Sequence, residues 1–262
     1  MERSIPAQID ELQQDGIYTV TRRELEERTG ARRRAVTAAV WRLKQSGRLV
    51  EPRRGFLVIV PLEYRSLGSL PASWFIDDLM RFLNQPYYVG LLTAAAIHGA
   101  AHHRPQEFQV VTDRPTRRIT VGRVRIRFVQ KSAIHEAAVQ DVKTETGTMR
   151  VSTPEETAFD LVRYAPVAGH LDNVATVLAD LAPQLDPERL VEVAGHFEES
   201  VAQKLGYLLD LVGATDRTDA LHAWLTARNP SRAPLGYGPR PFAGPVDPRW
   251  NVVVNRTMEV EQ

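Results

Sequence analysis

The sequence lacks cysteine altogether across its 262 residues, which excludes disulfide bonds, thiolate metal sites and cysteine nucleophiles. It also lacks a long hydrophobic run. The longest apolar segment, residues 87–101, is interrupted by His98 and is too short to span a bilayer. We expect no signal peptide, because no apolar core follows Glu2, Arg3 and Pro6. These absences favour a protein of the reducing cytoplasm that has no membrane partner.

Motifs of the common enzyme classes are missing as well. The sequence has no phosphate-binding loop of the GxxxxGK[ST] type, no GxGxxG turn after a predicted strand and no GxSxG nucleophile turn. Asp113, Lys143 and Glu145 could form a nuclease-like set of two carboxylates and a lysine. Their spacing is loose, however, and such sets arise by chance in a chain of this length. We therefore expect a protein that is not an enzyme and needs no cofactor.

Three histidines stand close together in the apolar segment. His98 and His102 are four residues apart, a spacing that could place two metal ligands on one helix face, and His103 follows. Gly99 and the approach to Pro105 predict that the helix ends there. This favours a capping or core-edge role over a metal site, and we predict no bound metal.

The net charge of only +1 conceals two strongly basic segments. Residues 31–60 carry eight basic side chains and one acidic side chain, a net charge of +7. Residues 104–131 carry eight basic and two acidic side chains, a net charge of +6. The remainder is acidic, so this pattern indicates a surface that binds a polyanion rather than a uniformly basic protein.

The N-terminal segment predicts two helices before the first basic segment. Ile5, Ile9 and Leu12 recur at the spacing of one helix face. Thr21 and Glu24 then have the spacing of a capping box, which predicts the start of a second helix. Apolar residues on either side of this cap, Val20 and Leu25, could form a hydrophobic staple.

A third helix is predicted over residues 32–46, with an apolar stripe formed by Val36, Ala39, Val40 and Leu43. Its outer surface is basic: one strip consists of Arg33, Thr37, Trp41 and Lys44, and the neighbouring strip of Arg34, Ala38 and Arg42. The three arginines at residues 32–34 oppose the helix dipole, which a recognition helix tolerates because its first turn meets DNA. Arginine also matches guanine O6 and N7 with two hydrogen bonds.

A hairpin is predicted after this helix, with strands at residues 48–50 and 56–60 and a basic turn at 51–55. The order of helix, helix, basic helix and basic hairpin predicts a winged helix-turn-helix over residues 1–60 that binds the DNA major groove. In such a module Arg53 and Arg54 would lie near the phosphate backbone. The predicted DNA-binding residues are Arg32, Arg33, Arg34, Thr37, Trp41, Arg42, Lys44, Arg53 and Arg54. The alternative is a solvated helix start followed by a merely structural hairpin.

The remaining sequence predicts a linker at residues 61–72 and a larger mixed α/β domain at 73–262, which makes the whole chain α+β. We expect helices at 74–83, 87–101, 154–162, 171–181, 187–197, 201–212 and 220–227. Strands are expected at 108–112, 149–152 and 250–254, with a hairpin at 119–129 that turns near Gly122 and an extended arm at 229–248. Thr153 and Glu156 predict a capping box at the start of the helix at 154–162.

The second arm of the hairpin at 119–129 alternates between basic and apolar residues. Arg123, Arg125 and Arg127 would face one side, and three apolar residues, Val124, Ile126 and Phe128, the other. A charged edge strand often serves only to prevent aggregation. A row of arginines without acidic residues equally suits a second polyanion contact, and the sequence leaves both interpretations open.

Four segments together resemble the AbiEi-type antitoxins of bacterial type IV toxin–antitoxin systems. They are residues 87–99 (YYVGLLTAAAIHG), 104–112 (RPQEFQVVT), 151–162 (VSTPEETAFDLV) and 204–210 (KLGYLLD), all behind the predicted winged module. The resemblance implies an N-terminal module that binds inverted repeats in its own promoter and represses the operon. It also implies a C-terminal domain that opposes a nucleotidyltransferase-like toxin, and it carries over no catalytic residues.

The expected partners are therefore double-stranded promoter DNA and, functionally, the cognate toxin. Because no long heptad seam occurs, we expect a monomer in solution that binds the repeats cooperatively. Replacing Arg33 should then reduce sequence preference, whereas replacing Arg53 should weaken binding to all DNA alike. Two alternatives remain open. One is an enzyme, a nuclease or toxin-modifying transferase, that the winged module targets; the other is an antitoxin that binds its toxin directly.

Overall fold

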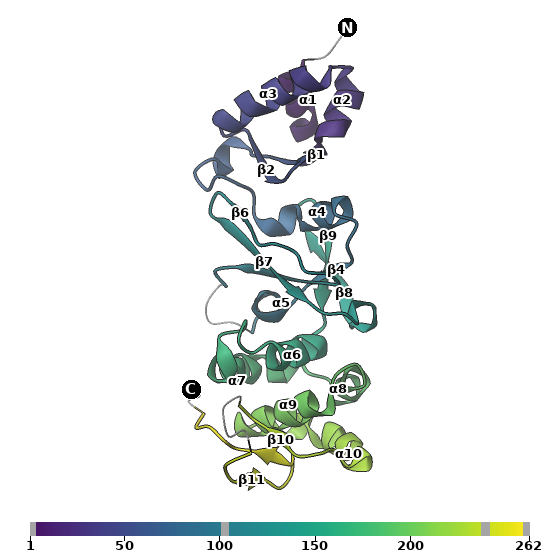
Figure 1. Ribbon diagram of the computed structural model, residues 1–262, viewed down its shortest axis with the longest axis vertical. Coiled ribbons are helices and arrows are strands. Elements are labelled where there is room, and N and C mark those ends of the chain that lie inside the picture. The colour runs from purple at the N-terminus through teal and green to yellow at the C-terminus, as the bar shows by residue number, and fades with distance from the viewer. Residues whose placement is uncertain (1–3, 101–104, 237–241, 259–262) are drawn as a thin grey trace. The chain divides into compact units, whose positions relative to one another are not determined.

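The computed structural model describes residues 4–100, 105–236 and 242–258 of the chain. They form a mixed α/β structure with ten α-helices and three β-sheets in those ranges (Figure 1). Two compact units can be distinguished: unit 1 comprises residues 1–88, 106–132 and 141–150, and unit 2 comprises 89–105, 133–140 and 151–262. None of the described helices combines the length and apolar character that a membrane span requires.

Unit 1 begins with three helices and a small antiparallel sheet. The helices are α1 (Ile5–Gln14), α2 (Arg22–Thr29) and α3 (Arg33–Gln45). Strands β1 (Thr19–Thr21), β2 (Leu49–Arg53) and β3 (Phe56–Ile59) pair antiparallel in the order β1-β3-β2. The predicted capping box of α2 is present, because the Thr21 hydroxyl accepts from the Glu24 N–H and the Glu24 carboxylate accepts from the Thr21 N–H.

One apolar core holds these elements together. It contains the predicted faces of the first and third helices as well as residues of all three strands. Val20 and Leu25 belong to it too, as a hydrophobic staple requires. The core residues include Ile5, Ile9, Leu12, Val36, Ala39, Val40, Leu43, Leu49, Leu57 and Ile59.

Residues 61–72, predicted as a linker, are part of unit 1. They include a 3₁₀ turn at Leu62–Tyr64, and both Leu70 and Ala72 are buried. A second 3₁₀ turn (Ala72–Trp74) leads into α4 (Ile76–Phe82), where helix 74–83 was predicted. The compact units thus divide the chain differently from the predicted boundaries at 60 and 73, because hairpins far along the sequence pack with the N-terminal segment.

A six-stranded sheet follows, with the strand order β6-β7-β5-β4-β9-β8. Its members are β4 (Tyr87–Val89), β5 (Phe108–Thr112), β6 (Ile119–Val121), β7 (Val124–Gln130), β8 (Val139–Thr144) and β9 (Gly147–Ser152). The predicted hairpin is confirmed: β6 and β7 are antiparallel, and Val121 lies opposite Val124 around Gly122, which has a φ of 55°. β5 and β7 pair in parallel, with Phe108 opposite Ile126.

The helix predicted over residues 87–101 is wrong in its first part. Residues 87–89 form the buried strand β4, and within the described residues 87–100 only α5 (Leu91–Ile97) is helical. A strand that is buried on both faces is apolar throughout, so its pattern resembles that of a buried helix. The two tyrosines and Val89, followed by Gly90, favour the strand.

Unit 2 consists mainly of helices, as Figure 1 shows: besides α5 it contains α6 (Pro154–Arg163), α7 (His170–Leu181), α8 (Pro187–Ala194), α9 (Glu199–Leu211) and α10 (Asp219–Arg228). The predicted helices are confirmed there to within a few residues. The Thr153 capping box is only half formed. The Thr153 hydroxyl accepts from the Glu156 N–H, but the Glu156 carboxylate accepts from the Ala138 N–H.

The C-terminal part of unit 2 forms a small sheet instead of a plain extended arm. Strands β10 (Ala233–Pro234), β11 (Val246–Asp247) and β12 (Val252–Val253) pair in the order β10-β12-β11. Gln203 of α9 is buried and donates to the carbonyls of Ser231 and Trp250 at 3.1 and 3.0 Å. This amide fixes the small sheet against α9.

Candidate nucleic-acid interface

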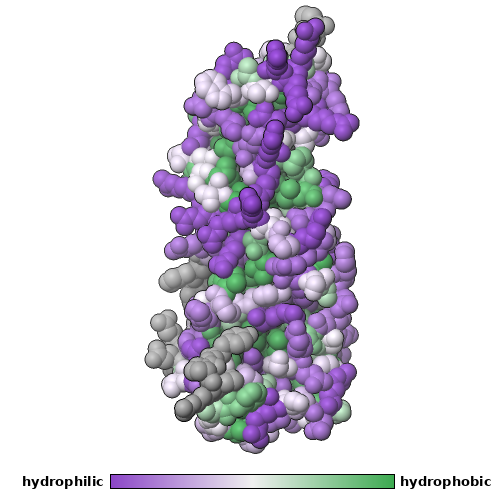
Figure 2. All heavy atoms as spheres, viewed as in Figure 1, coloured by the Kyte–Doolittle hydropathy of each residue, from purple (hydrophilic) through white to green (hydrophobic). Residues whose placement is uncertain are grey.

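The core determines which face of α3 is exposed. Its apolar stripe (Val36, Ala39, Val40 and Leu43) is buried. The opposite face must therefore point to solvent, since the helix cannot rotate without exposing the stripe. Figure 2 shows that hydrophilic side chains cover most of the visible surface over the N-terminal helices.

The exposed face of α3 is an open groove of about 720 Å³. Three arginines line it, together with a threonine, an alanine and Trp41, and no acidic residue takes part. Trp41 exposes 62% of its surface. Within the described part of the chain, no ion pair neutralises these arginines. The lining residues are Arg33, Arg34, Thr37, Ala38, Trp41 and Arg42.

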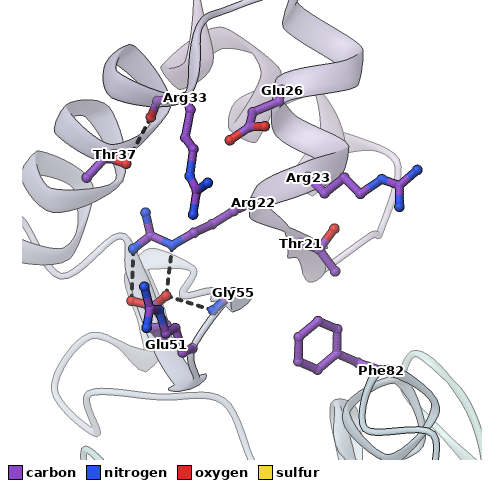
Figure 3. A pocket seen from close by; sticks show the side chains of 10 residues that line it. Thr21, Arg22, Arg23, Glu26, Arg33, Thr37, Glu51, Gly55 and Phe82 are labelled. Atoms are coloured by element: carbon purple, nitrogen blue, oxygen red, sulfur yellow. Dashed lines mark hydrogen bonds and ion pairs between the residues drawn. The ribbon is translucent and has the colours of Figure 1, made fainter.

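A second groove, of about 860 Å³, lies between α2, the start of α3, the β2–β3 turn and Phe82 of α4 (Figure 3). Arg33 and Thr37 line both grooves, so they connect the outer face of α3 to the turn. Arg54 and Gly55 form that turn, and Gly55 has a φ of 92°, which glycine adopts without strain. This surface brings Arg33 and Arg54 to the same groove.

Glu51 is the polar centre of this second groove, and nothing in the sequence pattern singled it out. Arg22 donates to both carboxylate oxygens of Glu51, at 2.8 and 3.0 Å. Lys44 also donates to this carboxylate, at 2.9 Å. The N–H of Gly55 donates to it at 3.0 Å (Figure 3). The hydrogen bonds from Arg22 are the main cause that lowers the pKa of Glu51 to about 2, although burial opposes them. The carboxylate thus joins α2, α3 and the β2–β3 hairpin.

Two of the predicted DNA-binding residues are engaged inside unit 1. Lys44 is paired with Glu51, and the Arg53 guanidinium donates to the carbonyl of Arg117. Burial lowers the pKa of Arg53, and the charge of Arg117 lowers it further. The strand β2 continues through Arg53, so the turn is shorter than the predicted 51–55. An edge strand with a register shift tolerates Pro52, which has no N–H to donate.

The arginine row on β7 is partly compensated. Arg127 lies 3.6 Å from the carboxylate of Glu107, which also pairs with Arg118 at 3.1 Å. The acid was absent from the strand pattern because it precedes the neighbouring parallel strand β5. Arg123 and Arg125 are exposed. Two cations of the predicted row therefore remain available on this hairpin.

The other candidate residues do not come together into a site. His98 directly follows α5, and its Nε2 lies 2.8 Å from the carbonyl oxygen of Ser152, which fits the predicted cap or core-edge role. His102 and His103, like Arg104, lie outside the described residues. Among the residues that are described, no group of histidines and carboxylates could hold a metal ion.

The carboxylate and lysine set is also separated. Asp113 follows β5, whereas Lys143 lies on β8 and Glu145 in the turn after it. Strands β4 and β9 lie between β5 and β8, so the two sides are about 14 Å apart at the usual spacing of neighbouring strands. The sheet topology therefore does not support a nuclease-like centre at these residues.

Replacing Glu51 by glutamine should destabilise the chain in a pH-dependent way. Hydrogen bonds to a charged group contribute about 2 kcal/mol, so the free energy of unfolding should fall by roughly that amount at pH 7. The pKa of Glu51 is lowered from 4.5 to about 2, so its stabilising contribution is complete above pH 4.5 and is lost as the pH falls toward 2. The free energies of unfolding of the wild type and Glu51→Gln should therefore converge as the pH falls, which urea denaturation from pH 7 to pH 2 measures.

Glu27→Gln provides the matched control on α2. Glu27 pairs with Arg23 at 2.7 Å, but both side chains are largely exposed, so the pair should contribute little. Equal losses in Glu51→Gln and Glu27→Gln would contradict the structural role given to Glu51.

The comparisons with known proteins agree with this architecture. Residues 88–211 match a family model described as the AbiEi antitoxin C-terminal domain. The crystal structure of the RV2827C protein from Mycobacterium tuberculosis is similar in fold, with a TM-score of 0.65 and 19% sequence identity. That similarity covers 93% of this chain and 88% of the other. No curated protein matches the chain. The family match confirms the resemblance predicted from the sequence and supports an antitoxin role: residues 88–211 are similar to the AbiEi antitoxin C-terminal domain.

Proposed function

We propose that the N-terminal part of unit 1 is a winged helix-turn-helix that binds promoter DNA and represses its own operon. In this proposal α3 is the recognition helix and the β2–β3 hairpin is the wing. The observation that carries the proposal is the exposed face of α3, where Arg33, Arg34 and Arg42 have no ion pair in the described part of the chain. Unpaired arginines on the exposed face of a helix that packs on the core suit a polyanion with a regular groove.

The structure changes which wing residue we expect to contact phosphate. Arg53 is engaged with the Arg117 carbonyl, whereas Arg54 in the turn is exposed and has no ion pair among the described residues. We therefore assign the phosphate contact to Arg54. Arg123 and Arg125 on the β6–β7 hairpin belong to the same unit and would add a second contact to the DNA backbone.

Arg33→Ala and Arg54→Ala should affect DNA binding in different ways. A base contact contributes to discrimination, so Arg33→Ala should weaken binding to the promoter repeat about tenfold while leaving shuffled DNA nearly unaffected. A phosphate contact is independent of sequence, so Arg54→Ala should weaken binding to both DNAs by a similar factor. Fluorescence anisotropy with the two duplexes measures both affinities. Unchanged affinities in both variants would contradict the assignment.

We propose further that the chain is the antitoxin of a type IV system whose toxin is a nucleotidyltransferase-like protein. The family match over residues 88–211 supports this role. The proposed toxin is the protein encoded by the neighbouring gene. Co-expression of the present chain with this toxin should restore the growth of cells that the toxin arrests. The two proteins should separate on purification, because in this proposal the antitoxin counteracts the effect of the toxin without forming a stable complex with it. Stable co-purification would favour an antitoxin that binds its toxin directly.

The protein should bind repeated half-sites cooperatively as a monomer. Paired half-sites require two copies of the recognition helix, and cooperative binding can supply them without a preformed dimer. Sedimentation without DNA should give the mass of one chain, and titration of a two-repeat duplex should be steeper than that of a single repeat. A stable dimer without DNA would contradict this arrangement.

A further inference from the structure

Trp41 is the most unusual residue on the exposed face of α3. It exposes 62% of its surface, although the buried stripe of α3 is already complete without it. Tryptophan side chains are highly buried on average, so an indole that faces solvent among arginines suggests a functional explanation. Its position on the proposed recognition helix makes contact with a ligand the simplest one.

Helical spacing places Trp41 in an apolar patch. Thr37 and Ala38 lie four and three residues before Trp41, so all three share one surface of the helix. The Thr37 hydroxyl donates to the carbonyl of Arg33 at 2.9 Å, which commits its proton to the helix backbone. Thr37 therefore offers its methyl group rather than a donor. Ala38 is small and lines the same groove as the indole. We call these three residues the apolar patch.

Arginines flank the apolar patch on both sides along the helix. Arg34 lies one turn before Ala38 and Arg42 one turn after it, and all these side chains line the same groove. A protein partner would have to cover guanidinium groups that form no ion pair in the described part of the chain. Burying such charges without partners is costly. The charges therefore favour a polyanionic ligand over a second apolar protein surface.

Duplex DNA presents an apolar group among anionic and acceptor groups. In the major groove, the 5-methyl group of thymine lies beside base edges and within reach of the phosphates. We propose that the apolar patch contacts thymine 5-methyl groups, so that Trp41 is a specificity-determining residue of the recognition helix. This inference rests on the proposed DNA-binding function. It requires thymine next to the bases that the flanking arginines contact.

Substituting deoxyuridine for thymine in the half-site tests the proposal, because it removes only the methyl group. Wild-type protein should bind the substituted duplex about fourfold more weakly for each contacted methyl, as expected for one buried apolar group of that size. Trp41→Ala should weaken binding to the thymine duplex, and its affinities for the two duplexes should be nearly equal. Anisotropy titrations of both proteins with both duplexes give the four affinities.

Leu62→Ala is the matched control, because Leu62 exposes 73% of its surface in the same unit but lies outside α3. This variant should keep the wild-type ratio between the two duplexes. Circular dichroism should show that Trp41→Ala is folded, since the residue lies outside the core.

The outcomes separate the two proposals. If the wild-type protein showed no specific DNA binding, the proposed function itself would be contradicted. Tight, specific binding with equal affinity for thymine and deoxyuridine duplexes would overturn only the role of the apolar patch. A wild-type preference for thymine that persists in Trp41→Ala would also overturn it. So would a change in oligomeric state of Trp41→Ala without DNA, because the patch would then be a protein interface.

Discussion

Replacing Arg33, Arg34 and Arg42 together by alanine should lower the affinity for promoter DNA about a thousandfold at physiological salt. Each arginine contact to a base or phosphate contributes about 1–3 kcal/mol, so three losses of about 1.4 kcal/mol give this factor. The three side chains are exposed and unpaired in the described ranges, so their removal should not disturb the fold. Anisotropy titration of labelled promoter duplex measures the loss.

The salt dependence gives an independent reading of the same change. Each phosphate contact that is lost should reduce the slope of log K against log salt by about 0.9. A matched triple variant in unit 2, Arg189→Ala with Arg228→Ala and Arg232→Ala, removes the same charge from exposed positions. This control should retain nearly wild-type affinity. If both triple variants lost affinity equally, only net charge would matter, and the assignment to α3 would be wrong.

Gly206→Ala should destabilise unit 2 strongly. A Cβ atom at residue 206 would lie 2.2–2.4 Å from ring atoms of Trp250, a separation that packed atoms do not tolerate. The ring cannot shift freely, because its Nε1 donates to Asp210 at 2.7 Å and the ring packs edge-on against His222. Overpacking of this kind costs about 3 kcal/mol. Thermal denaturation followed by circular dichroism should show a clear loss of stability.

Gly195→Ala is the control for this prediction. Gly195 has a φ of −61°, and the nearest atom to an added Cβ is the Glu192 carbonyl oxygen at 3.4 Å. Alanine fits this helical conformation, so the change should be nearly neutral. A melting temperature of Gly206→Ala equal to that of Gly195→Ala would show that Trp250 does not pack on residue 206 as described.

Local signals in the sequence were sufficient to predict most of the N-terminal fold. The spacing of Thr21 and Glu24 predicted the α2 cap, and the apolar stripe of α3 predicted its buried face, because both depend on neighbours within one or two turns. The turn at Gly122 was predicted for the same reason. In each case the interacting residues are close together in the sequence, so their types and spacing are enough to predict the interaction that forms the element.

Interactions between distant segments were missed. The Glu51 carboxylate binds Arg22 from 29 residues earlier, and Arg53 binds a carbonyl 64 residues later. Neither pairing leaves a periodic pattern, so Arg53 was predicted as a phosphate contact and Glu51 was given no role. Strand β4 was read as a helix because complete burial removes the alternation that marks a strand.

The segment at residues 204–210 shows both what the sequence pattern could predict and what it could not. It contributed to the family resemblance as a series of letters, but its physical basis appears only with the structure. Gly206 makes room for the Trp250 ring, and Asp210 accepts the indole N–H from 40 residues later. Arg249 also lies 3.2 Å from the Asp210 carboxylate. Gly206 and Asp210, one turn apart on α9, therefore position the Trp250 ring.

The most direct test of the proposed DNA-binding function is the binding of the unaltered chain to the DNA immediately upstream of its own gene. A labelled fragment of this region should be bound at physiological salt at least about a thousandfold more tightly than a shuffled fragment of equal composition, the margin of specific binders. Equal affinity for the two fragments, or no binding to either, would contradict the assignment of α3 as a recognition helix.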